Sequence, residues 1–297
     1  MVDERDFWIV SQLRKDPFTS FETLGRGAGL SGNAVKARIE ALEKGKIVSS
    51  LQGLPAAQVF HRFPRLFFFE MPSPVMLDDI LEIDSAVFAT QDVDRKVGVL
   101  AYNLSNAAKP PEELVDLLGP IEFDVTPLLP YPQKELSKPV TIAELRVLRM
   151  LVSNLRVPIK EIAESTGLSQ KTSKKIRRQL LEDGLLQVQP IFQTAQSYGI
   201  IMYELHVHSG DNSVLFRIRQ SLPKSIFLNQ WDPSAMIFSC WADSLAEVFE
   251  TQKKLRSEPS VSRVLVKFHT QAILSTSRLS TWIDEEILRL ESNKTKA

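Results

Sequence analysis

The side chains with the clearest chemistry are a run of cations in the second half of the chain. Residues 167–180 read Gly-Leu-Ser-Gln-Lys-Thr-Ser-Lys-Lys-Ile-Arg-Arg-Gln-Leu, and no acidic residue follows before Glu182. Thr172, Ile176 and Leu180 recur at helical spacing, so the segment predicts a helix with one apolar face. The opposite face carries the cations, and a helix of this kind suits the major groove of DNA.

The neighbouring segments predict how this basic helix is positioned. Residues 157–163 indicate a short helix, and a turn through Gly167 follows. Ser169 is placed to cap the basic helix by accepting a backbone N–H bond. Gly184 marks its end, and a strand begins directly afterwards. Helix, turn, basic helix and strand in this order predict a winged helix-turn-helix.

We expect the outer face of the basic helix to contact double-stranded DNA. Its members are Ser169, Gln170, Lys171, Lys174, Lys175 and Arg178. The N-terminus of a recognition helix enters the groove, so Gln170 and Lys171 should lie nearest the base edges. The other cations should divide between bases and phosphates. The alternative interpretation is a solvated charged face on an ordinary surface helix, which the flanking elements disfavour.

The same unit occurs earlier in the chain. Gly-Leu-Ser stands at residues 29–31 and again at 167–169, a shift of 138 positions that also aligns apolar positions in three predicted helices. A repeat of this length indicates duplicated domains rather than a solenoid. The first recognition helix offers Ser31, Asn33 and Lys36 for DNA, but it also carries Glu40. A module that has lost DNA binding is therefore a credible alternative for this copy alone.

Composition narrows the class of protein. The chain has 297 residues, 43% of them hydrophobic, which suits two or more packed domains. Its one cysteine, Cys240, excludes an intrachain disulfide and a cysteine zinc cluster, and it fits a reducing cytoplasm. The acidic start lacks a signal-peptide pattern, and no apolar run is long enough for a membrane helix. We find no motif for a catalytic residue, a cofactor or a metal.

The net charge of zero conceals an uneven distribution. Residues 136–190 hold ten Lys and Arg against five Asp and Glu, whereas residues 51–135 hold six against thirteen. Positive charge is thus concentrated in the second helix-turn-helix, where contacts with phosphates would need it.

The remaining segments predict two copies of a β-α-β-β-α-β unit, which is the ferredoxin-like arrangement. The expected fold class is α+β, with two winged helix-turn-helix domains alternating with two ferredoxin-like domains. The expected domains are residues 1–52 and 135–190 for the helix-turn-helix copies, and 53–134 and 191–297 for the ferredoxin-like copies. The last domain also includes a C-terminal helix.

This combination resembles the Lrp/AsnC (feast-famine) regulators, in a tandem duplicated form. Residues 29–48 carry the Gly-Leu-Ser-x-x-x-Val-x-x-x-Ile-x-x-Leu pattern of the family nearly intact, whereas the second copy has Ser173 and Arg177 at the Val and Ile positions. The resemblance implies sequence-specific DNA binding under small-molecule control. The family's effector domain often has a Gly-containing turn before its third strand, and the corresponding stretches here contain no Gly.

The same domains also resemble siroheme decarboxylases, a tetrapyrrole enzyme group that is the alternative function. The candidate residues are His61 and Arg62, with His206 and His208, which share one face of a predicted strand. Half-buried strand histidines are the simpler explanation of that pair. We see no match to the decarboxylases' substrate motifs, so the expectation is a regulator and not an enzyme.

Two further expectations concern control and assembly. If an effector binds, the second ferredoxin-like unit is the better site, because His206, His208, Trp231 and Asp232 combine stacking with hydrogen bonding. The two ferredoxin-like units are expected to pair within one chain as a pseudo-dimer, joined by the proline-containing linker 127–139. Further association into a homo-oligomer is left open.

Overall fold

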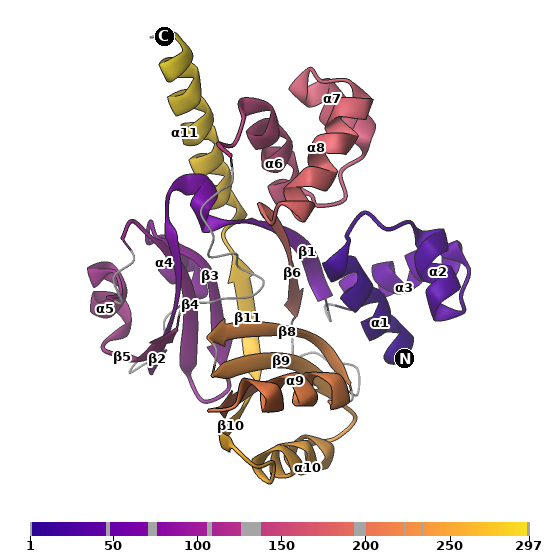
Figure 1. Cartoon of the computed structure of the whole chain (residues 1–297), viewed down its shortest axis with the longest axis vertical. Helices are drawn as coiled ribbons and strands as arrows, with labels where there is room; N and C mark the ends of the chain where they lie inside the picture. The colour runs from indigo at the N-terminus through magenta and orange to yellow at the C-terminus, as the bar shows by residue number, and fades with distance from the viewer. Residues whose placement is uncertain are drawn as a thin grey trace.

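The computed structural model describes residues 2–45, 48–70, 76–105, 109–125, 138–192, 200–222, 224–232 and 234–295. Two three-helix heads lie beside two β-sheets, each covered by helices (Figure 1). Among the described helices, none has the length and apolar character needed to cross a membrane. The proline linker lies almost entirely outside the described residues.

The first head forms because three short helices each bury one apolar side. Its elements are α1 (Glu4–Lys15), α2 (Phe21–Ala28), α3 (Gly32–Lys44) and β1 (Val48–Pro55). Asp3 caps α1 in a reciprocal capping box with Asp6. The core of the head contains Ile9, Leu13, Leu24 and Val35.

The second head repeats this plan. Its elements are α6 (Ile142–Ser153), α7 (Ile159–Thr166), α8 (Gln170–Glu182) and β6 (Leu186–Phe192). Thr141 and Glu144 form the capping box of α6. Gly167 ends α7 with φ at 69°, a left-handed conformation that favours glycine.

The wing strands of the two heads pair with each other. β1 and β6 are antiparallel, with Leu51 opposite Pro190 and Gly53 opposite Val188. A Cβ atom on Gly53 would lie 2.7 Å from the carbonyl oxygen of Leu151, so glycine permits α6 to pack closely on β1. This pairing connects segments that are more than a hundred residues apart in the sequence.

The first sheet contains the first β-α-β-β-α-β unit. Its elements are β2 (Phe63–Glu70), α4 (Leu77–Leu81), β3 (Ala86–Asp92), β4 (Lys96–Asn103), α5 (Glu112–Leu118) and β5 (Ile121–Val125), with a 3₁₀ turn η1 (Ala57–Phe60) before them. The strand order is β11-β3-β4-β2-β5. Phe67 and Phe69 are fully buried beneath α4 and α5.

The second sheet contains the second unit. Its elements are β7 (Ile201–Ser209), α9 (Asn212–Ser221), β8 (Ser225–Asp232), β9 (Ala235–Ala242), α10 (Leu245–Arg256) and β10 (Val261–Lys267). The order β10-β7-β9-β8 is that of a ferredoxin-like sheet, with the first and third strands central. Leu205, Phe238 and Val248 form part of its core.

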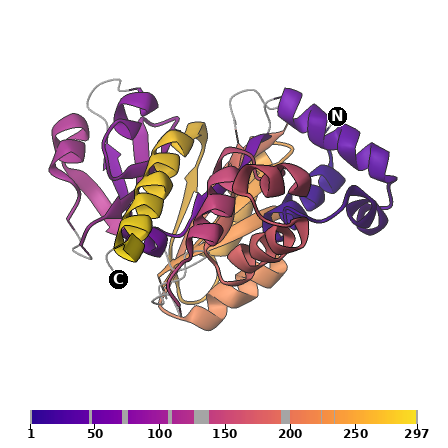
Figure 2. The ribbon, with the colours of Figure 1, turned by 90° about the horizontal axis from the view of Figure 1, so that it is seen from above.

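The C-terminal segment joins the second unit to the first. β11 (His269–Leu274) follows β10 after one residue but pairs with β3 of the first sheet. The sequence analysis expected no strand here. α11 (Thr276–Thr295) then packs along α6 (Figure 2). Arg149 pairs with Asp284 at 3.2 Å, and Arg146 pairs with Glu291 at 3.1 Å.

The predicted fold class is confirmed, since two winged helix-turn-helix heads alternate along the chain with two β-α-β-β-α-β units. The spacing of apolar residues within single helices and strands was sufficient to predict the order of these domains along the chain. The β1–β6 and β11–β3 pairings arise only in the folded chain, and they bring the two halves together.

Candidate nucleic-acid interface

Helix α8 is held in place by its cap and by its inner face. The Ser169 hydroxyl accepts the backbone N–H of Thr172 at 3.1 Å, as predicted. The buried positions are Ser173, Ile176 and Leu180. Thr172 was predicted to face the core but is exposed, where its hydroxyl lies 2.8 Å from that of Ser169. Ser173 takes the inner position, one residue later in the turn.

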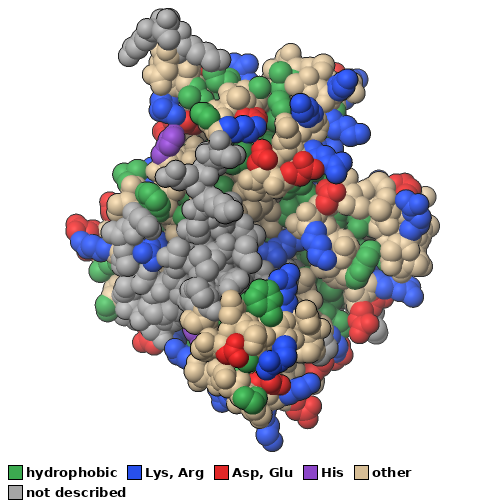
Figure 3. All heavy atoms as spheres, in the orientation of Figure 1, with side chains coloured by type: hydrophobic (Ala, Val, Ile, Leu, Met, Phe, Trp, Pro, Cys, Tyr) green, Lys and Arg blue, Asp and Glu red, His purple; other side chains and the backbone are tan. Residues whose placement is uncertain are grey.

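The outer face of α8 is strongly positive. The exposed side chains on it are Gln170, Lys171, Lys174, Lys175 and Arg178. Arg178 pairs with Glu182 at 2.7 Å, one helical turn away. Among the described residues, no ion pair involves the three lysines. Lys and Arg side chains accordingly gather over this head in the space-filling view (Figure 3).

Helix α3 presents a weaker face. Ser31 caps it by accepting the backbone N–H of Ala34 at 3.1 Å. Asn33 and Lys36 are exposed, as the sequence predicted for DNA-facing residues. Lys36 lies 3.7 Å from Glu40, however, and that carboxylate would repel phosphate. The two recognition helices therefore differ in charge although they share a backbone plan.

Two arginines of the second head contact the first head. Arg177, on α8, stacks over the Phe18 ring at 4.0 Å, and Arg156 stacks over Phe21 at 4.5 Å. Arg156 also donates to the Pro17 carbonyl at 2.9 Å. Burial lowers the pKa of both guanidinium groups. The sequence analysis noted Arg177 at an apolar position of the motif but did not predict this contact, which sets the position of α8 relative to the first head.

Of the four predicted effector residues, the structure describes the side chains of His206 and His208. His206 is 2% exposed, 3.2 Å from Glu204, and its ring meets Phe68 edge-on at 6.0 Å between centroids. Burial lowers the pKa of His206. His208 lies farther along β7 and is half-buried. The side chains of Trp231 and Asp232 fall outside the described residues.

His206 belongs to a buried charged cluster that the sequence analysis missed. His269 bridges Asp92 and Glu204, 3.0 Å from the latter, and Lys267 lies 3.0 Å from Asp92. Burial opposes protonation of His269, but the two carboxylates outweigh it and raise its pKa to about 10. Despite burial, the cations hold the pKa of Asp92 and Glu204 below their usual values.

This cluster joins the two sheets, because Asp92 ends β3 and the other members come from β7, β10 and β11. The negative charges of Asp92 and Glu204 are balanced by the positive charges of Lys267 and His269. The charged groups of the cluster therefore neutralise one another. Within the described part of the chain, no group of three His, Cys, Asp or Glu side chains could hold a metal ion.

The alternative enzyme residues near the first sheet are engaged in structural contacts. Arg62 stacks over Trp282 at 4.1 Å and pairs with Asp84 at 3.0 Å. His61 is exposed at the end of η1, 3.2 Å from the guanidinium group of Arg289. Both neighbours in sequence therefore contact α11, Arg62 at Trp282 and His61 at Arg289.

Known proteins share parts of this sequence and fold. A family described as winged helix-turn-helix DNA-binding matches residues 141–187. The curated proteins gave no match. The crystal structure of the siroheme decarboxylase NirDL covers 96% of this chain and 99% of its own, at 13% identity and a TM-score of 0.51.

Shorter regulators match one half of the chain. The structure of AsnC from E. coli covers 46% of this chain and 93% of its own, with 13% identity and a TM-score of 0.32. LrpC from B. subtilis covers 46% and 96%, with 18% identity and a TM-score of 0.33. The predicted winged helix-turn-helix is confirmed by the family match, and the predicted tandem form is confirmed by the solved structure that matches nearly the whole chain.

One prediction is contradicted. A protein that is not an enzyme was predicted from the sequence, yet two solved structures that match nearly the whole chain are those of an enzyme. A winged helix-turn-helix in this tandem fold is therefore no argument against catalysis.

Proposed function

We propose that the chain is a DNA-binding transcriptional regulator of Lrp/AsnC type that contacts duplex DNA chiefly through α8. The observation that carries this proposal is the exposed row of Lys171, Lys174, Lys175 and Arg178 on one helix face. Clustered cations release the counterions of the DNA backbone when they neutralise phosphates. Gln170 at the N-terminus of α8 then lies where a recognition helix meets base edges.

The assembly proposed from the sequence accompanies this function. Pairing of β1 with β6, and of β11 with β3, supports an intrachain pseudo-dimer in which both heads act together. Control by a small molecule at His206, His208, Trp231 and Asp232 is the finer part of the proposal, as is a homo-oligomer. A DNA-binding role also carries with it the expected cytoplasmic location.

The test is DNA affinity by fluorescence anisotropy with random-sequence duplexes. The double variant Lys174→Ala/Lys175→Ala should lose at least about tenfold in affinity, because two phosphate contacts disappear. The matched control is Lys253→Ala/Lys254→Ala, which removes two exposed cations from α10. Equal losses in both variants would mean that net charge, and not α8, governs the binding.

A second candidate is an enzyme of siroheme-decarboxylase type, and the whole-chain comparison favours it more than regulation. The observation is the shared tandem fold over 96% of this chain. The surface chemistry of α8 favours DNA instead, so the two candidates rest on different features. Absorption spectra and product masses after incubation with siroheme test this candidate. A shifted tetrapyrrole band with loss of carbon dioxide would support it, and an unchanged spectrum and mass would remove it.

A further inference from the structure

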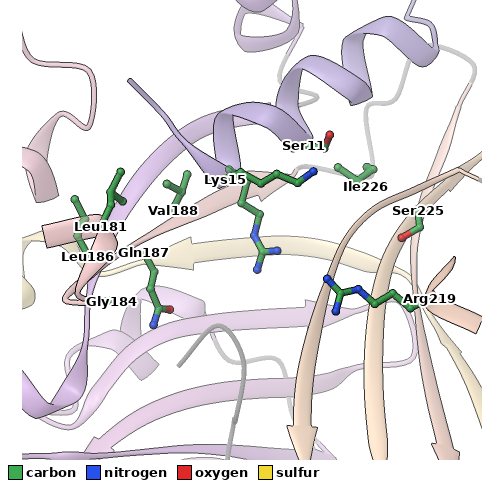
Figure 4. A pocket seen from close by; sticks show the side chains of 11 residues that line it. Ser11, Lys15, Leu181, Gly184, Leu186, Gln187, Val188, Arg219, Ser225 and Ile226 are labelled. Carbon is green, nitrogen blue, oxygen red and sulfur yellow. The ribbon is translucent and has the colours of Figure 1, made fainter. Parts of the chain in front are cut away.

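A cleft of about 530 Å³ lies where the two heads meet the second ferredoxin-like unit (Figure 4). One wall comes from α1, a second from the end of α8 and from β6, and a third from α9 and the start of β8. The described residues that line it are Ser11, Arg14, Lys15, Leu181, Gly184, Leu186, Gln187, Val188, Arg219, Ser225 and Ile226. The outer face of α8, which is proposed above to bind DNA, takes no part in this lining.

The charge of the cleft is one-sided. Arg14 and Lys15 approach from α1 and Arg219 from α9, whereas no Asp or Glu appears among the described lining residues. Lys15 and Arg219 are exposed, and no ion pair engages either of them in the described part of the chain. In the close view, Lys15 and Arg219 extend from different elements toward the same space (Figure 4). Cations facing one cavity attract anions and focus their field there.

The rest of the lining is apolar or neutral. Leu181, Leu186, Val188 and Ile226 provide hydrocarbon surface, while Ser11, Gln187 and Ser225 add neutral polar groups. A volume of this size and a mixed lining are typical of small-molecule pockets. DNA phosphates alone would leave the apolar surface unmatched.

We propose that this cleft binds a small organic anion with an apolar body and at least two acidic groups, carboxylate or phosphate. One acidic group pairs with Lys15 of the first head, and the other pairs with Arg219 of the second unit. The apolar body lies against Leu186 and Ile226. The ligand therefore connects the first head to the second sheet. The proposal stands whether or not α8 binds DNA.

The cleft also adjoins the recognition helix. A second groove of about 360 Å³ shares Lys15 and Leu181 with it and is lined by Lys174 and Arg178 of α8. An anion on Lys15 lowers the positive electrostatic potential beside α8. A bound ligand therefore lowers the affinity of α8 for DNA. Because such coupling is reciprocal, bound DNA lowers the affinity of the cleft for the ligand by the same factor.

The experiment is isothermal titration of the full chain with three probes: trimesate, 1,4-phenylene bisphosphate and inorganic pyrophosphate. We expect saturable binding at one site per chain, with benzoate much weaker because it has a single acidic group. The trimesate and phenylene bisphosphate arms distinguish a carboxylate ligand from a phosphate ligand, and the pyrophosphate arm shows what the apolar body contributes. Absence of saturable binding by all three probes overturns the proposal.

Variants locate the site. Lys15→Gln/Arg219→Gln should weaken the best probe at least about tenfold, since charge-assisted hydrogen bonds are lost. Arg217→Gln/Lys253→Gln is the matched control, which removes two exposed cations outside the cleft. Thermal melting confirms that each variant folds. Unchanged affinity in the double variant, or equal loss in the control, overturns the proposal. So does a loss of DNA affinity in the double variant without any loss of probe affinity, because the cleft would then be part of the DNA surface.

Discussion

Ser173 offers a direct test of how the second recognition helix is built. Its side chain is fully buried at the position that Val35 occupies in the first head, and its hydroxyl has no hydrogen-bond partner among the residues that the structure describes. A buried unsatisfied hydroxyl costs about 1–3 kcal/mol. Ser173→Ala removes the hydroxyl without adding volume, and alanine has the higher helix propensity. We expect the head to gain about 1–2 kcal/mol.

Ser173→Val extends the test to packing. Valine replaces the hydroxyl by a methyl and adds a second methyl, which contributes about 1 kcal/mol if the space accepts it and costs about 1–3 kcal/mol if it does not. The reverse change, Val35→Ser, should destabilise the first head by about 2–3 kcal/mol through lost burial and a new buried hydroxyl.

The assay is native-state hydrogen exchange of the α8 amides in the full chain, which reports the local opening free energy. Slower exchange in Ser173→Ala supports the reasoning, and the DNA affinity should stay unchanged because the side chain faces inward. Faster exchange in Ser173→Ala would refute it, since the hydroxyl would then be making a stabilising bond.

Three further predictions concern the buried charged cluster, the contact between the two heads and the first recognition helix. The pKa of His269 is raised from 6.5 to about 10. The stability that protonated His269 contributes is therefore present below pH 6.5 and is lost as the pH rises through about 10. Urea melts should show this fall in the free energy of unfolding, and His269→Gln should abolish it. Arg156→Ala should speed hydrogen exchange in α2 but not in α5, because the ring stack on Phe21 and the bond to Pro17 disappear, at a cost of about 1–3 kcal/mol. Lys36→Ala should lower DNA affinity only mildly by anisotropy, and a large loss would show that both heads share the contact.

The sequence predicted features that depend on local spacing. The Ser169 cap, the glycine after α7 and the order of strands and helices are set by residues within one or two turns of each other. The inner face of α8 was misplaced by one residue, since the step from Thr172 to Ser173 turns the side chain by about 100° and both are small and polar.

Features that depend on distant residues were not predictable in this way. β11 lies one residue after β10, and only its pairing with β3 reveals that it belongs to the other sheet. The cluster of Asp92, Glu204 and His269 joins residues from both halves of the chain. The basic cleft likewise takes its cations from α1 and α9, which are about two hundred residues apart in the sequence.

The salt dependence of DNA affinity measures whether the lysines of α8 contact DNA phosphates. Each phosphate contact contributes about one unit to the slope of log affinity against log salt concentration. The account predicts that Lys174→Ala/Lys175→Ala lowers this slope by about two units, while Lys253→Ala/Lys254→Ala leaves it unchanged. An unchanged slope in the α8 variant, or no measurable affinity of the wild-type chain for duplex DNA, would contradict it.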